Sequence, residues 1–165
     1  MSALTPLRTL DVAGTTFAYV RAGRGSPVAL VHGNLASHRY WQELLAGPPA
    51  GTELIAMDLP NFGASGPLPE PLSIRAYGEA LASFLRALEL PPVTLVGHSL
   101  GGAVAPADYH GPEASIRGFE VLAAEPSAAA RRAMIARRCR ASCPRAARPT
   151  SRSCWTRPAR SPRRP

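Results

Sequence analysis

The chain contains no lysine, so its 19 basic residues are all arginines, a bias typical of GC-rich coding DNA. Its apolar runs are no longer than a strand, and the sequence therefore predicts no membrane-spanning helix. Residues 1–10 lack a basic stretch followed by an apolar run, so we expect no targeting signal and a cytoplasmic location. A length of 165 residues is typical of a single domain.

Cysteine is scarce, and acidic residues are absent from the end of the chain. The three cysteines are Cys139, Cys143 and Cys154; their odd number, with no histidine or acid nearby, argues against a zinc site or a disulfide framework. Residues 126–165 hold twelve arginines and no acid, whereas residues 1–125 hold all 11 acids. We therefore expect a partial folded domain over 1–125 and a disordered basic tail over 126–165.

Apolar runs that predict strands alternate with segments of helical spacing. Such alternation indicates the α/β class, with a mostly parallel sheet that binds ligands at the carboxyl ends of its strands. His32, Asp58 and Ser99 each follow a predicted strand. The predicted strands are 7–12, 15–20, 27–31, 54–57, 92–96 and 119–123, and the predicted helices are 38–45, 74–88 (capped by Ser73) and 100–104.

Ser99 lies at the apex of the segment Gly97-His98-Ser99-Leu100-Gly101-Gly102. The glycines allow the close backbone approach that a sharp strand-to-helix turn requires. Such a turn presents the serine hydroxyl at the end of a strand, with backbone N–H groups of the following helix nearby to stabilise an oxyanion. A glycine-rich turn without function is the alternative, but the strand before it and the helix after it favour a nucleophile.

Three segments together resemble the esterase-like branch of the α/β-hydrolase superfamily. They are Val28–Asn34 (VALVHGN), Asp58–Ser65 (DLPNFGAS) and Gly97–Gly102 (GHSLGG). The resemblance covers residues 7–105 well and extends loosely to 125. It implies an α/β-hydrolase core, with helices flanking a mostly parallel sheet, that is incomplete at the C-terminus.

The resemblance also implies a function, the hydrolysis of ester-like or related acyl bonds of a small molecule without cofactor or metal. Ser99 would be the nucleophile, and the backbone N–H groups of Asn34 and Leu100 would form the oxyanion hole. His32 would orient the oxyanion loop, which we favour over a role as base. Structural roles fall to His32, Gly33, Asp58, Gly97, His98 and Gly101.

The sequence also gives an expected environment for three polar residues near these segments. We expect Asp58 to organise its loop by accepting turn N–H groups, and His98 to pack against neighbouring strands. His38, at the start of a predicted helix, is expected to be solvated.

The chain departs from the family in its catalytic acid and base. A serine nucleophile needs a base and an orienting acid, which follow it in this family in the order acid, then histidine. His110 lies about 15 Å along the helix from Ser99 at about 1.5 Å per residue, so it is a poor candidate for the base. Glu125 is a candidate acid, although a loop carboxylate is the simpler interpretation. We therefore expect this chain to have weak activity or none.

The basic tail has two interpretations. It is either a functional arm for nucleic acid or an anionic surface, or a translation of GC-rich DNA in a shifted frame. We favour the second, because a basic arm would not explain the loss of the family's remaining strands. Nucleic acid and membrane partners are not expected. The alternative to a hydrolase is a non-catalytic truncated product or a protein that binds through its basic tail.

Overall fold

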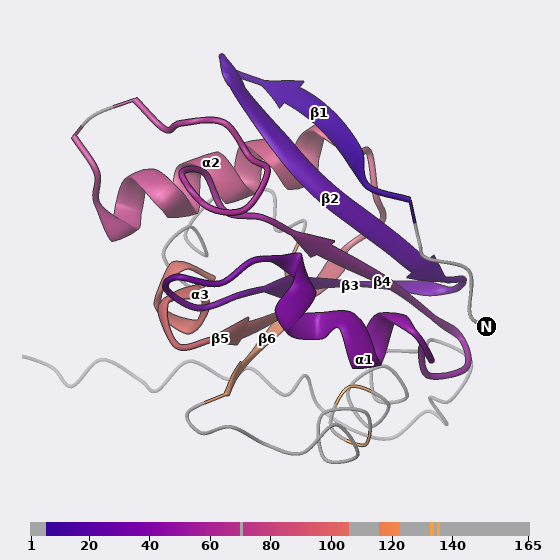
Figure 1. The fold of residues 1–165 in the computed structure, drawn as a ribbon. Coiled ribbons are helices and arrows are strands. Elements are labelled where there is room, and N and C mark those ends of the chain that lie inside the picture. The colour runs from indigo at the N-terminus through magenta and orange to yellow at the C-terminus, as the bar shows by residue number, and fades with distance from the viewer. Residues whose placement is uncertain (1–5, 70, 106–115, 123–132, 134, 136–165) are drawn as a thin grey trace, which may run out of the picture.

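The computed structural model describes residues 6–69, 71–105 and 116–122, together with residues 133 and 135. Six strands form one sheet in the order β1-β2-β4-β3-β5-β6 (Figure 1). The strands are β1 Arg8–Val12, β2 Thr15–Gly23, β3 Ser26–Val31, β4 Thr52–Met57, β5 Val93–His98 and β6 Ile116–Leu122, and the helices are η1 His38–Trp41 (a 3₁₀ helix), α1 Gln42–Leu45, α2 Ile74–Ala87 and α3 Leu100–Val104.

The sheet is mixed, with a parallel part and an antiparallel part. Strands β4, β3, β5 and β6 are parallel neighbours, whereas β2 pairs antiparallel with both β1 and β4. The hairpin between β1 and β2 turns at Ala13 and Gly14, which both have positive φ. The predicted α/β class and the predicted N-terminal hairpin are therefore confirmed.

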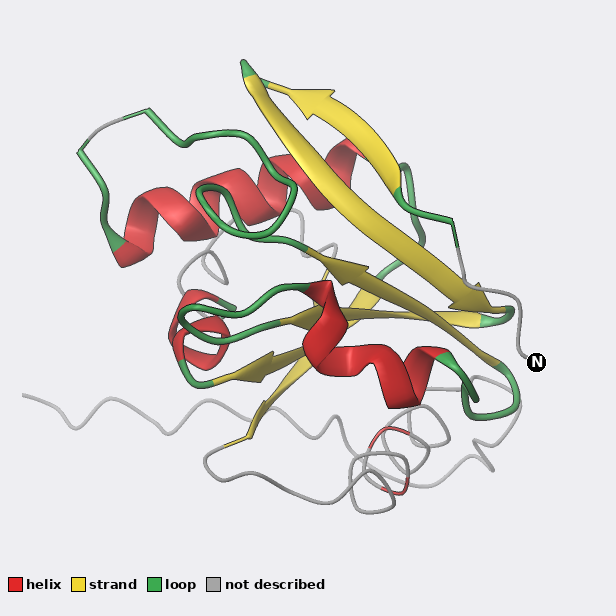
Figure 2. Ribbon diagram, viewed as in Figure 1, coloured by secondary structure: helices red, strands yellow, loops and turns green. Residues whose placement is uncertain are grey.

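Helices cover both faces of the sheet, and α2 and α1 lie on opposite sides of it (Figures 1 and 2). Alternate residues of β3 point to opposite faces. Ala29 and Val31 join the apolar cluster that includes residues of α2 and α3, whereas Val28 and Leu30 join the cluster that includes Trp41 of η1. A strand buried on both faces is expected to be a continuous apolar run, which is the pattern that the sequence shows here.

The helix starts follow local capping. The Oγ atom of Ser73 accepts a hydrogen bond from the backbone N–H of Ala76 at 3.0 Å, so α2 begins where the sequence predicts. The predicted helix over 38–45 is a 3₁₀ turn followed by one α-helical turn, anchored by the fully buried Trp41 and Leu44.

No helix in the described part of the chain has the length and apolarity of a membrane span.

Candidate functional site

Ser99 occupies a strained turn between β5 and α3. Its backbone has φ 50° and ψ −115°. A positive φ of this kind costs a residue with a side chain about 1–3 kcal/mol. The residue is also exposed. A Cβ on Gly97 would lie 2.3 Å from the carbonyl oxygen of Gly101, and a Cβ on Gly101 would lie 2.3 Å from that of Val31. The tight approach that the sequence predicts around Ser99 is therefore present, and it requires both glycines.

The loop that follows β3 lies against this turn. A Cβ on Gly33 would be 3.1 Å from the Cβ of Ser99 and 2.9 Å from Nδ1 of His98. Asn34 comes next in the chain and is exposed. The structure thus brings the backbone of Gly33 beside Ser99, with Asn34 next along the chain.

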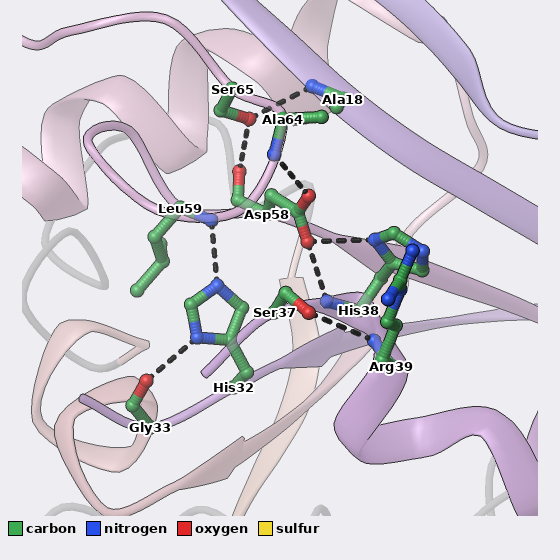
Figure 3. Close-up of polar contacts among 10 residues, drawn as sticks. All are labelled: Ala18, His32, Gly33, Ser37, His38, Arg39, Asp58, Leu59, Ala64 and Ser65. Carbon is green, nitrogen blue, oxygen red and sulfur yellow. Dashed lines mark hydrogen bonds and ion pairs between the residues drawn. The ribbon is translucent and has the colours of Figure 1, made fainter. Parts of the chain in front are cut away.

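His32 is buried and uses both nitrogens of its ring on the backbone (Figure 3). Nε2 accepts a hydrogen bond from the N–H of Leu59 at 2.9 Å, so the ring proton is on Nδ1, which donates to the carbonyl oxygen of Gly33 at 2.7 Å. Burial lowers the pKa of His32. The neutral ring joins the ends of β3 and β4, and neither nitrogen is left to take a proton from a nucleophile.

Asp58 is a buried carboxylate that joins its own loop to η1. One oxygen accepts from the N–H of Ala64 at 2.9 Å, and the other accepts from the backbone N–H of His38 and from its Nδ1, the latter at 2.9 Å. The Asp58 carbonyl oxygen also accepts from Oγ of Ser65 at 2.7 Å (Figure 3). These bonds fit the role of loop organiser that we expected for Asp58.

The expectation that His38 is solvated is wrong. Only 19% of its side chain is exposed, and its ring pairs with the buried carboxylate of Asp58. The two residues are 20 positions apart, one in η1 and the other directly after β4. The sequence contains no periodic signal for such a contact, so analysis of the sequence alone missed it.

The ring of His98 stacks on a residue of η1. Its centroid is 4.5 Å from that of Tyr40, and the planes differ by 15°. We expected His98 to pack against neighbouring strands; the stack with Tyr40 adds a contact outside the sheet. Tyr40, like His38, is a residue of η1 to which sequence reasoning gave no role at the site.

The candidate acid, and the histidine that follows Ser99 in the sequence, are not among the described residues. Glu125 and His110 both lie outside the described residues, as do the three cysteines. Within the described ranges, no group of three or more histidine, cysteine or acidic side chains could hold a metal ion. The described part of the site therefore consists of the Ser99 turn, the Gly33–Asn34 backbone and their supports.

Comparison of the sequence with known proteins gives one family. The model of the "Alpha/beta hydrolase family" matches residues 28–164. A Rattus norvegicus protein, provisionally named a protein-lysine deacylase, is 34% identical over 128 residues, which are 70% of this chain and 60% of that protein. A haloalkane dehalogenase of Mycolicibacterium smegmatis is 32% identical over 103 residues, 59% of this chain and 33% of that protein.

Solved structures of the same fold also resemble the chain. An N-acyl homoserine lactonase with bound N-butanoyl homoserine has a TM-score of 0.64 at 25% identity, over 70% of this chain and 44% of that one. A haloalkane dehalogenase from Agrobacterium tumefaciens has a TM-score of 0.64 at 22% identity, over 71% and 40%.

The chain spans less than two thirds of the length of each of these relatives. The family match covers most of the chain. The sheet and helices of the chain have the fold of the solved hydrolases. This protein belongs to the alpha/beta hydrolase family.

Proposed function

We propose that this chain carries the nucleophile of a serine hydrolase that cleaves ester-like or related acyl bonds of a small molecule, with Ser99 as that nucleophile. The observation that carries the proposal is the exposed, positive-φ Ser99 between β5 and α3. A residue held at such an unfavourable φ is a pointer to function, because the strain has to be compensated by the surrounding structure.

The neighbouring backbone supplies a matching oxyanion hole. Leu100 is the first residue of α3, so its N–H has no partner inside the helix. Asn34 follows Gly33, which lies against Ser99. Two N–H groups on either side of a serine hydroxyl suit the tetrahedral intermediate of acyl transfer, whose negative oxygen they would stabilise by several kcal/mol.

A serine hydroxyl favours acyl transfer over other hydrolytic chemistry, since it forms a covalent acyl-enzyme with esters, thioesters and amides. The lactonase among the structural relatives is named for a cyclic ester, which supports the same substrate class. The dehalogenase names show that other bonds are cleaved in this family, so the fold alone does not choose the substrate.

We expect slow chemistry from the chain as it stands. Its three described histidines are engaged elsewhere: His32 with the backbone, His38 with Asp58, and His98 stacked on Tyr40. If no side chain serves as base, neither these three nor His110 outside the described residues, hydroxide from the solvent would take the Ser99 proton. The rate of covalent reaction at Ser99 should then rise continuously with pH, whereas a histidine base would give a plateau above its pKa.

The test is covalent labelling of the purified full chain with a fluorophosphonate, read by intact mass and peptide mapping. We expect one adduct, on Ser99, that Ser99→Ala abolishes and Ser83→Ala, a matched change on α2, leaves unchanged. The hydrolysis of a short p-nitrophenyl ester, followed in parallel, should be weak and depend on Ser99. Labelling spread over several serines, or equal in wild type and Ser99→Ala, would overturn the proposal.

A further inference from the structure

The short helix η1 contacts the ends of two parallel strands through two of its side chains. His38 bonds to Asp58, which follows β4, while Tyr40 stacks on His98, the last residue of β5. The next residue, Trp41, is fully buried in the apolar cluster on that face of the sheet. The helix is therefore anchored at three points in a region of four residues.

The loop between β3 and η1 depends on its two ends for its position. Its backbone contributes Asn34 to the proposed oxyanion hole, but Asn34 is exposed and Leu35 is 90% exposed with φ 53°. Side chains that face solvent do little to hold a loop in place. His32 fixes the loop at its start, and η1 fixes it at its end.

His98 lies between η1 and the proposed oxyanion loop. The centroid of its ring is 4.5 Å from that of Tyr40. The buried Nδ1 of His98 is 2.9 Å from the place that a Cβ on Gly33 would occupy. Ser99 is the next residue. Stacking stabilises such a ring pair beyond the area that it buries, which favours one orientation of the His98 ring.

We propose that Tyr40 is a positioning residue, which acts through the His98 ring to set the spacing between the Gly33–Asn34 backbone and Ser99. The catalytic consequence rests on the proposed function of Ser99. The spacing matters because an error of about 1 Å between a nucleophile and its oxyanion donors reduces the rate by as much as about 100-fold.

The first experiment measures the rate constant for fluorophosphonate labelling of Ser99 in the folded full chain. Tyr40→Leu removes the ring and should lower this rate constant about 10- to 100-fold. Tyr40→Phe keeps the ring, so its labelling rate constant should stay close to that of wild type. The matched control is Tyr19→Leu: Tyr19 packs edge-on against Phe84 in the other apolar cluster, so its loss should lower stability and leave the labelling rate unchanged.

A double-mutant cycle tests whether Tyr40 acts through His98. In a His98→Leu background the stack is already lost, so adding Tyr40→Leu should lower the labelling rate no further. Independent, multiplicative losses from the two changes would overturn the proposal. Should Tyr40→Leu not fold, Tyr40→Met provides a variant without the ring.

A second measurement separates this inference from the proposed function. If wild type forms no adduct at Ser99, the proposed function fails, and backbone amide resonances in NMR then decide the positioning role. Tyr40→Leu should shift the amide signals of Gly33, Asn34, Ser99 and Leu100, while Tyr40→Phe and Tyr19→Leu leave them in place. Equal shifts in Tyr40→Leu and Tyr19→Leu would contradict a positioning role.

Discussion

The Nε2 atom of His32 accepts a hydrogen bond from the backbone N–H of Leu59 at 2.9 Å, which links the ends of two adjacent parallel strands. The bond requires an unprotonated Nε2, and burial of the ring lowers the pKa of His32 below its ordinary value of 6.5. The link between β3 and β4 is therefore sensitive to acid.

The stability of the protein should fall as the pH drops below about 6.5. In that range the unfolded chain binds a proton at His32 that the folded chain does not, so the free energy of unfolding decreases toward the folded pKa. Above about 6.5 this contribution is fully present. The slope from one such group is at most about 1.4 kcal/mol per pH unit.

Urea unfolding at a series of pH values checks this, with His32→Gln as the comparison. The variant should be less stable at neutral pH by about 1–3 kcal/mol, because a buried partner of the Leu59 N–H is replaced. It should also show a shallower dependence on pH than wild type. Parallel curves for the two proteins would show that another group causes the acid sensitivity.

Asp58→Asn should lower the stability by about 2–3 kcal/mol. The buried carboxylate accepts from the N–H of Ala64 and from two nitrogens of His38, and an amide would turn one of these acceptors into a donor. Asp11→Asn is a suitable control, since Asp11 accepts an exposed bond from Thr16 and its loss should change stability little. Similar effects of the two changes in urea unfolding would contradict the role given to Asp58.

The sequence predicts the elements whose signals are local. The continuous apolar run of β3 follows from burial on both faces, the start of α2 follows from the Ser73 cap, and the turn at Ser99 follows from its flanking glycines. Each of these features depends on residues within a few positions of one another. Periodicity and turn chemistry therefore suffice to locate them.

The contacts that support the site could not be predicted in this way. His38 with Asp58, and Tyr40 with His98, join residues far apart in the sequence, and only the packing of η1 across the strand ends brings them together. The same local pattern predicts a surface helix with a solvated histidine. Whether His38 is solvated or buried is decided by how η1 packs against the strand ends, and no local pattern in the sequence indicates that packing.

Ala13→Asn should stabilise the protein by as much as about 1 kcal/mol. Ala13 and Gly14 form the turn between β1 and β2 with φ of 49° and 82°, and asparagine adopts positive φ more readily than alanine. Ala13 is exposed, so the larger side chain meets no packing obstacle. An increase in the midpoint of urea unfolding, with an unchanged slope, is the expected result; a decrease would indicate that the turn in solution is of another type.

Gly97→Ala should destabilise the protein by about 3 kcal/mol or more and abolish labelling of Ser99. The new Cβ would lie 2.3 Å from the carbonyl oxygen of Gly101, and backbone atoms cannot move away as the end of a flexible side chain can. Gly14→Ala is the matched control: its Cβ meets nothing within 4 Å, so only its φ of 82° opposes the change, at about 1–2 kcal/mol. Labelling should persist in that variant. If Gly97→Ala folds with wild-type stability and still reacts at Ser99, the close approach of β5 and α3 is not what holds the serine in its strained conformation.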